Sequence, residues 1–249
     1  MYRDIRVVMS FLKVLKKIFY NRKIMVPIFI VIIVGLTLVA LVPMFYSIFT
    51  GPGVTTEPIN AEKTKPASTE VDGNWEVVAG NPNNSTSVGF TFAEILPAEQ
   101  TVTSGSTTDV TGQAEISEQT IESALITVTM DGLTTDKKVR DENMKTKLFE
   151  TSEFPESTFE LAEPVDISAV PEDGSLADVE LTGDLTIKGE TKSVTETFQV
   201  ARDGETILLG GNIPINRLDF NVITPDMIAA KIDEEGTVDI RLTMKKIDN

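Results

Sequence analysis

The side chains that could carry chemistry in this chain are limited by two absences, since its 249 residues include neither cysteine nor histidine. Without cysteine, the chain has no disulfides, no thiolate nucleophile and no zinc–thiolate site. Without histidine, it lacks the usual general base and the commonest transition-metal ligand. Carboxylates, lysine, tyrosine and hydroxyl groups remain as the available reactive groups.

Carboxylates are the most numerous of these groups, and they form two clusters, 172–173 and 233–235. Neither cluster has the alternating oxygen-ligand spacing of a calcium loop, and each lies beside a glycine, which indicates a solvated turn. The sequence contains no Walker loop, no G-x-S-x-G motif and no G-x-G-x-x-G motif. No carboxylate pair carries a signal of glycosidase chemistry. We therefore expect no enzyme, no catalytic residue, no metal site and no cofactor.

Charge is distributed unevenly along the chain, whose net charge is −16. Residues 1–23 hold seven Lys or Arg and one acid, and subtracting their net of +6 leaves −22 for residues 24–249. An acidic body of this size favours solubility and repels nucleic acid. We therefore expect no nucleic-acid partner.

Residues 24–49 contain no charged side chain and are numerous enough for a helix that crosses a bilayer. A cleaved signal peptide is the alternative, but its apolar core would be shorter and a small-x-small cleavage site would follow, which this stretch lacks. The basic residues before the stretch place the N-terminus in the cytoplasm. The sequence therefore predicts a cytoplasmic basic segment over 1–23, a single-pass signal anchor in the cell membrane over 24–49, and an extracytoplasmic remainder.

Residues 50–73 have no apolar periodicity and are rich in Pro, Thr, Glu and Lys. Such a composition cannot offset chain entropy by burying apolar surface. It predicts a flexible linker that holds the following domain near the membrane.

From residue 74 to the end, the pattern indicates β-strands. Its clearest part is 178–200, where apolar residues at every second position occur on both sides of a polar turn at Gly189. Two alternating runs joined in this way predict an antiparallel hairpin, which needs further strands to bury its apolar face. The apolar positions are Val179, Leu181, Leu185, Ile187, Val194, Phe198 and Val200.

Further alternating runs separated by turn residues predict about eight strands in all, the pattern of an all-β sandwich or barrel. These runs are 74–79, 88–92, 114–116, 124–130, 159–167, 207–215 and 238–244. Residues 134–150 differ, because they are rich in helix formers and end near Phe154–Pro155. They predict a short helix with an apolar stripe formed by Val139, Met144, Leu148 and Phe149.

Four motifs follow one another along this β region. They are the serine-, valine- and phenylalanine-containing run from Ser85 to Phe90; Arg140–Asp141 followed by Met144, Phe149, Pro155 and Phe159; G-D-L-T-I-K-G at 183–189; and N-R-L-D-F at 216–220. In this order and spacing, residues 75–247 resemble the YceI-like family of extracytoplasmic isoprenoid-binding proteins.

The resemblance implies an eight-stranded antiparallel, lipocalin-like barrel over 74–249 with a short helix at one end and an apolar interior for a polyisoprenoid. Eight strands enclose an interior that is either filled by side chains or holds one slim ligand. Members of the family often carry histidine in two neighbourhoods where this chain has Ala93 or Glu94, and Asn143. Polar contacts made by those histidines are therefore not expected here.

The inward-facing parity of the strands assigns a set of large apolar residues to the interior, and we expect these to contact the ligand. They are Phe90, Phe92, Met130, Phe149, Phe154, Phe159, Leu185, Phe198, Ile215 and Phe220. Parity does not distinguish a pocket wall from a packed core. For the ligand head group or the mouth, we expect Arg140, Asp141, Asn143 and Arg217. Their alternative roles are structural, such as a helix cap or an ion pair of Arg217 with Asp219.

These expectations combine into a membrane-tethered, extracytoplasmic binding protein that holds an isoprenoid-type lipid and catalyses no reaction. The alternative is a filled barrel that serves as a structural or interaction module of the cell envelope. The expected partners are the lipid and the cytoplasmic membrane, which residues 24–49 would cross. The oligomeric state is left open, with a homodimer as one option.

Overall fold

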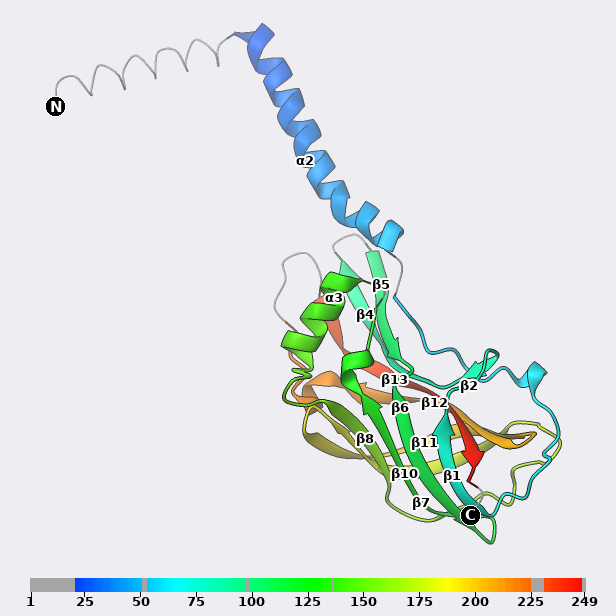
Figure 1. Ribbon diagram of the computed structural model, residues 1–249. Coiled ribbons are helices and arrows are strands. Elements are labelled where there is room, and N and C mark those ends of the chain that lie inside the picture. Colours follow the sequence, from blue (N-terminus) through cyan, green and yellow to red (C-terminus); the bar gives the residue numbers. More distant parts are fainter. Residues whose placement is uncertain (1–20, 51–52, 97–98, 136, 225–230, 248–249) are drawn as a thin grey trace. The chain divides into compact units, whose positions relative to one another are not determined.

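The computed structural model describes residues 21–50, 53–96, 99–135, 137–224 and 231–247 (Figure 1). The chain divides into two compact units, Met1–Gly51 and Pro52–Asn249. Of the predicted basic segment at 1–23, only the last three residues lie within the described part of the chain.

In the described part of the first unit, the long helix α2 (Arg22–Thr50) covers the stretch predicted to be a signal anchor. Within the residues that the structure describes, no helix combines the length and the hydropathy needed to cross a membrane. The anchor therefore stays a prediction from the sequence.

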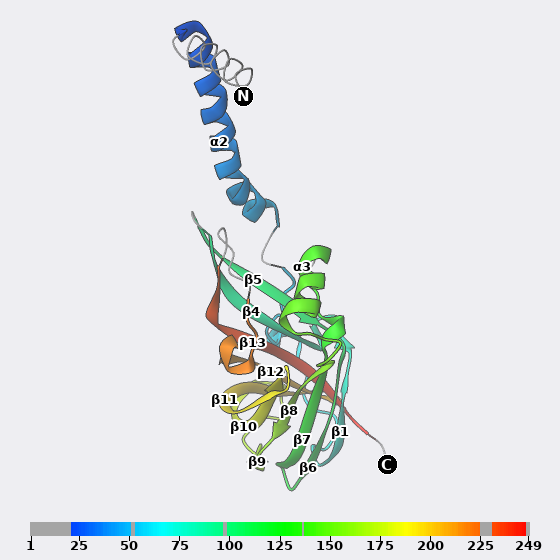
Figure 2. The ribbon, with the colours of Figure 1, turned by 90° about the vertical axis from the view of Figure 1, so that its left-hand side faces the viewer.

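The second unit is a closed barrel of eight antiparallel strands (Figures 1 and 2). The ring closes because β13 pairs with β12 along one edge and with β1 along the other, where Trp75 lies opposite Lys246. In order around the ring the strands are β1 (Gly73–Val78), β6 (Val110–Ser117), β7 (Thr120–Thr129), β8 (Glu156–Leu161), β10 (Ala177–Ile187), β11 (Glu190–Asp203), β12 (Thr206–Asn216) and β13 (Lys231–Lys246). The predicted all-β, eight-stranded antiparallel barrel is confirmed.

The predicted hairpin is the pair β10–β11, which turns at Lys188 and Gly189. Both turn residues have positive φ, as a two-residue hairpin turn of this kind requires. Along β10, buried and more exposed residues alternate from Val179 to Ile187, so the two-residue periodicity did identify the face that forms the core.

A second hairpin, β4 (Ser87–Leu96) and β5 (Glu99–Thr107), extends the sheet beside the first half of β13. The sequence did not predict β5, because its buried residues are polar. Ser104 pairs with Gly53 and Ser106 with Thr134, so β5 is covered by neighbouring backbone and needs no apolar face. Three two-residue strands complete the list: β2 (Gly80–Asn81), β3 (Asn84–Ser85) and β9 (Val165–Asp166).

Residues 53–72, here called the strap, differ from the flexible linker that their composition predicts. The strap includes the short helix η1 (Ala61–Lys63) and belongs to the same compact unit as the barrel. Its apolar residues Ile59 and Val71 are buried. Hydrogen bonds hold it to the barrel, among them the backbone N–H of Lys65 to the Asp203 carboxylate at 2.8 Å. A few apolar residues and a polar backbone network thus order a segment of linker-like composition.

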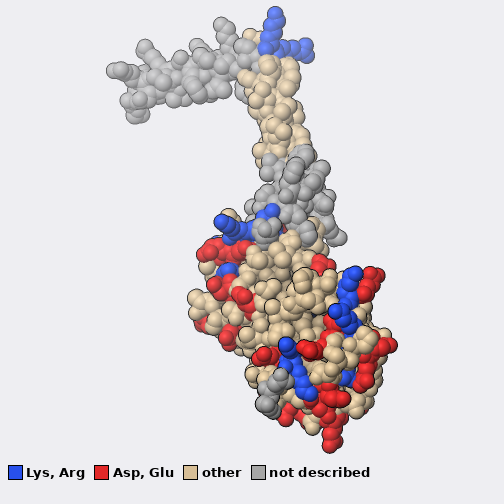
Figure 3. Space-filling model, turned by 45° about the vertical axis from the view of Figure 1, so that its right-hand side comes forward, with Lys and Arg blue, Asp and Glu red and all other residues tan. Residues whose placement is uncertain are grey.

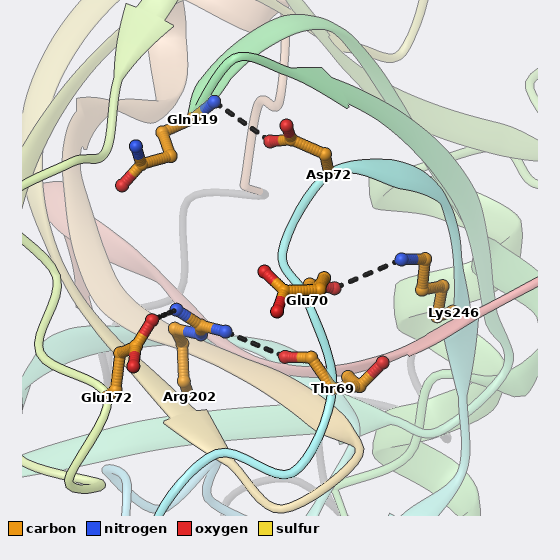
Figure 4. Close-up of polar contacts among 7 residues, drawn as sticks. All are labelled: Thr69, Glu70, Asp72, Gln119, Glu172, Arg202 and Lys246. Carbon is orange, nitrogen blue, oxygen red and sulfur yellow. Dashed lines mark hydrogen bonds and ion pairs between the residues drawn. The ribbon is translucent and has the colours of Figure 1, made fainter.

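The strap ends by crossing one end of the barrel, here called the base, where the β6–β7 and β11–β12 turns lie. Figure 4 shows three contacts there: Arg202 donates to the Thr69 carbonyl at 2.7 Å, Lys246 to the Glu70 carbonyl at 3.1 Å, and the backbone N–H of Gln119 to the Asp72 carboxylate at 2.9 Å. Arg202 also pairs with Glu172 at 2.8 Å. These contacts fix the strap over the base.

The opposite end, here called the mouth end, carries the predicted helix as α3 (Lys138–Asn143) followed by a wide π-helical turn, η3 (Met144–Leu148). Two short 3-10 helices also lie at this end, η2 (Met130–Gly132) and η4 (Arg217–Phe220). The predicted apolar stripe is only partly correct: Met144 is 2% exposed, but Val139 is 77% exposed.

Candidate functional site

An apolar cavity of about 160 Å³ lies inside the barrel. Its wall extends from Ile121 on β7 and Met244 on β13 to Phe149, Phe220 and Val222 at the mouth end. Trp75 and Ile167 belong to the same core near the base but do not line the cavity. The core directly beneath the strap is therefore packed, and the hollow part of the barrel extends from there to the mouth end.

The size of the cavity limits what it can hold. An engineered apolar cavity of about 150 Å³ stays dry and binds benzene. The cavity observed here therefore suits a slim apolar segment, and a long chain would have to displace wall residues or extend beyond the mouth end.

Small side chains on two neighbouring strands help to create this space. Ala114 on β6 lies directly opposite Ala124 on β7, and both belong to the wall. Protein interiors are otherwise close-packed. Two methyl groups facing each other in the middle of a barrel leave volume that larger residues would fill.

Nine of the ten residues predicted to contact the ligand line the cavity: Phe90, Phe92, Met130, Phe149, Phe159, Leu185, Phe198, Ile215 and Phe220. Phe154 does not, because it packs against Gly189 at the β10–β11 turn. It lies in a loop, where strand parity has no meaning. Whether the nine contact a ligand stays a prediction.

Further residues of the wall were not among those predicted to contact the ligand, including Ile126 on β7, Leu209 on β12 and Ile240 on β13. They follow the same two-residue periodicity as the residues it selected. The sequence therefore does carry a signal for these residues, but the predicted set favoured large aromatic side chains.

Arg217 is the one charged residue that lines the cavity among the described residues. It is 6% exposed, and its guanidinium donates to three backbone carbonyls, those of Val222 at 2.8 Å, Asp233 at 3.0 Å and Ile232 at 3.4 Å. The alternative of an ion pair with Asp219 is wrong, because Asp219 is exposed and the carbonyls take its place. Arg217 thus ties η4 to the start of β13 and places a cation in an apolar wall.

The other three residues predicted for the head group or mouth do not line the cavity. Arg140 donates to the Thr103 hydroxyl at 3.1 Å, and Asn143 donates to the Val139 carbonyl within its own helix. The first contact joins α3 to β5, and the second lies within the helix. The alternative structural role that the sequence left open is what the geometry supports for them.

Asp141 joins α3 to the preceding segment. Its carboxylate accepts from the Thr134 hydroxyl at 2.7 Å and from the N–H and hydroxyl of Thr135 at 2.7 and 2.6 Å. Burial by itself raises the pKa of Asp141, but these hydrogen bonds and the charge of Lys145 outweigh it and lower the pKa below its usual value. The carboxylate therefore stays ionised and fixes the start of the helix.

A polar clamp crosses the mouth end. The ammonium of Lys188, at the β10–β11 turn, donates to the Glu150 carboxylate at 3.0 Å and to the Asn221 carbonyl at 3.2 Å. The Lys188 side chain is only 11% exposed. The clamp links the segment after η3 to the segment after η4, so the two segments that cover the mouth end both contact Lys188.

The chemistry that this arrangement permits is binding. The wall has no carboxylate and no lysine among the described residues, and its polar side chains are those of Ser157, Thr158 and Arg217. In the same part of the chain, no group of three or more carboxylates is placed to hold a metal ion. An enclosed apolar space with few polar groups is typical of a site for an apolar ligand.

Comparison with known proteins is consistent with this geometry. The model of the YceI-like domain family matches residues 75–244. Among solved structures, Burkholderia cenocepacia BcnA is 24% identical, with a TM-score of 0.50, over 63% of this chain and 95% of that one. A polyisoprenoid-binding domain from Saccharophagus degradans, implicated in plant cell wall breakdown, is 17% identical, with a TM-score of 0.53, over 70% and 98%. At these identities the two structures establish the fold alone. Comparison with curated proteins finds no match.

Proposed function

Because the chain belongs to the YceI-like domain family, we propose that it is a binding protein without catalytic activity that holds a polyisoprenoid or similar amphiphilic lipid in its barrel. The cavity carries this proposal, since its wall is apolar except for Ser157, Thr158 and Arg217. Burying one CH₂ group contributes about 0.8 kcal/mol, so an apolar tail gains affinity from such a wall without specific polar contacts.

Arg217, the one charged residue in the described part of the wall, suggests how the ligand is oriented. Three N–H groups of Arg217 already bond to backbone carbonyls, and a guanidinium carries five. The tail would lie among the phenylalanine side chains, with a hydrogen-bond-accepting head group towards Arg217. The Saccharophagus degradans domain is a polyisoprenoid-binding domain of the same fold, which supports this class of ligand.

The proposal includes a location. Residues 24–49 would anchor the chain in the cytoplasmic membrane, with residues 1–23 in the cytoplasm and the barrel outside. Its support is the uncharged run of residues and the basic residues before it. Alkaline carbonate extraction of cell membranes tests the anchor, because a chain released into the supernatant would rule it out.

The alternative of a completely filled barrel agrees less well with the cavity. Packing does fill the base, but the space beside Ala114 and Ala124 is not filled. A structural module would need no such space. We therefore favour the carrier.

The test uses the full chain, purified in detergent, and the variant Ala124→Phe, whose ring would fill the cavity. We expect mass spectrometry of organic extracts to find an isoprenoid-type lipid with the parent chain and to find about tenfold less with the variant. Leu125→Phe is the matched control, because Leu125 is the next residue and 48% exposed. Equal lipid in all three preparations, or none in any, would contradict the proposal.

A further inference from the structure

Exposed apolar side chains gather at the mouth end of the barrel unit. Among the described residues of the barrel unit, the exposed large apolar residues are Ile95, Val102, Leu125, Val139, Leu218 and Ile223. All except Leu125 lie on α3, on η4 and the residues after it, or near the end of the β4–β5 hairpin. The most exposed are Val139 at 77% and Ile223 at 65%. Clustered exposure of this kind marks an interaction surface.

The contacts already described place these elements on one rim. Lys188 connects the segment after η3 to Asn221, which is two residues before Ile223. Ile95 pairs with Lys231 at the start of β13, next to the carbonyls that Arg217 contacts. The exposed residues on these elements therefore lie at the mouth end of the barrel, which the cavity wall reaches at Phe149 and Phe220.

On this rim, residues 137–147 differ in charge from the rest of residues 24–249. Acidic side chains are spread widely over the face of the barrel unit in Figure 3. Residues 24–249 contain fifteen Lys or Arg, and five of these lie within 137–147, together with only two acids. Lys138 and Lys147 are exposed. A local excess of positive charge beside exposed apolar residues fits a surface of anionic lipid headgroups.

The course of the chain adds an independent argument. The strap begins at Gly53, which pairs with Ser104 on β5, and the neighbouring Thr103 accepts a hydrogen bond from Arg140 on α3. Residues 51–52 alone separate Gly53 from the end of α2, a connection that reaches about 11 Å at most. This limit is one of covalent length and holds for any orientation. A membrane anchor over 24–49 would therefore tether the barrel unit through Gly53, whose partner Ser104 lies next to the residue that Arg140 contacts.

We propose that the rim formed by α3, η4 and the residues up to Ile223 docks on the surface of an anionic lipid bilayer. This inference rests on the proposed function, because docking would let an isoprenoid tail pass between bilayer and cavity without crossing water. Val139 and Ile223 enter the headgroup region, and Lys138 and Lys147 contact lipid phosphates.

The chain has no native cysteine, which makes single-site labelling simple. The full-length variants Val139→Cys, Ile223→Cys and Leu125→Cys are labelled with an environment-sensitive fluorophore and reconstituted in vesicles of phosphatidylethanolamine and phosphatidylglycerol. We expect lipids with brominated chains to quench the first two labels at least about twofold more than the third. Leu125 is the control because it is exposed and apolar but lies on β7, away from the rim.

A charge test uses Lys138→Glu with Lys147→Glu in the Val139→Cys background. We expect this pair to reduce the quenching to that of the Leu125 label, whereas Lys63→Glu with Lys245→Glu, which makes the same change of charge near the base, leaves it unchanged. Equal quenching at all three labels, or cross-linking of Val139 to a protein in place of lipid quenching, would overturn the docking proposal.

The lipid content of the same preparations separates the two proposals. Bound lipid without preferential quenching at the rim would refute docking and leave the carrier function intact. Preferential quenching at the rim without bound lipid would refute the carrier function and support docking.

Discussion

The two ends of the barrel differ in how their interiors are filled. At the base, Trp75, Val71 and Ile167 are buried in one continuous core. Towards the mouth end, the wall residues enclose a cavity of about 160 Å³. Strands such as β10, which carries both Val179 and Leu185, contribute to both regions, so the strand pattern alone does not account for the difference.

The covering segments cause it. At the base, the strap inserts Val71, and the segment between β8 and β10 inserts Ile167 and Val170. At the mouth end, Asp141 and Arg217 hold α3 and η4 through polar contacts, and Phe149 after η3 and Phe220 on η4 line the space without filling it. The base thus contributes stability, and the mouth end keeps room for a ligand.

The largest expected effect is at the base. Trp75 is 1% exposed and its indole N–H donates to the Val71 carbonyl at 2.7 Å. We expect Trp75→Ala to lower the free energy of unfolding by about 3–5 kcal/mol, because it creates a cavity and leaves that carbonyl unpaired. Urea unfolding of the full chain in detergent, followed by circular dichroism, measures the change. A loss below about 1 kcal/mol would contradict a tightly packed base.

A matched pair of enlargements sharpens the comparison. Val179 faces inward near the base and does not line the cavity, whereas Ala124 does. We expect Val179→Phe to destabilise the barrel by about 1–3 kcal/mol, the usual cost of overpacking, and Ala124→Phe to cost less because space is available. The same urea unfolding measures both. Equal losses would mean that the two halves are packed alike.

The sequence predicted the barrel but not this asymmetry. Two-residue periodicity identified the inward face of β10, yet Val179 and Leu185 share that face and only Leu185 lines the cavity. The strap, which packs the base, has the composition of a linker. Its composition gave no signal of an ordered segment, because backbone hydrogen bonds and only a few apolar residues hold it to the barrel.

The sequence likewise did not show which of the predicted polar residues reach the cavity. Motif order drew attention to Arg140 and Arg217 alike, but only the structure shows that Arg217 reaches the cavity wall while Arg140 contacts Thr103. Which partner a long side chain finds depends on elements distant in sequence. The spacing of the motifs therefore identified both arginines but did not show that Arg217 lines the cavity and that Arg140 has a structural contact.

The smallest effect concerns the cover of the mouth end and depends on pH. The pKa of Asp141 is lowered in the folded state because hydrogen bonds from Thr135 and Thr134 and the charge of Lys145 outweigh the effect of burial. A lowered folded pKa contributes stability that is present above the unfolded value near 3.8 and is lost as pH falls through the folded pKa. We expect hydrogen exchange at the Thr135 N–H, corrected for its intrinsic pH dependence, to lose protection as pH falls below that value.

The Ser68 N–H is the control at the base, because it donates to the backbone carbonyl of Gly204 at 2.8 Å and has no titrating partner. Its protection should change less with pH than that of Thr135. Asp141→Asn should remove the pH dependence at Thr135, since an amide cannot ionise. If Thr135 kept its protection through the acid range, Asp141 would not hold α3. The result would contradict the view that polar contacts hold the mouth end whereas apolar packing holds the base.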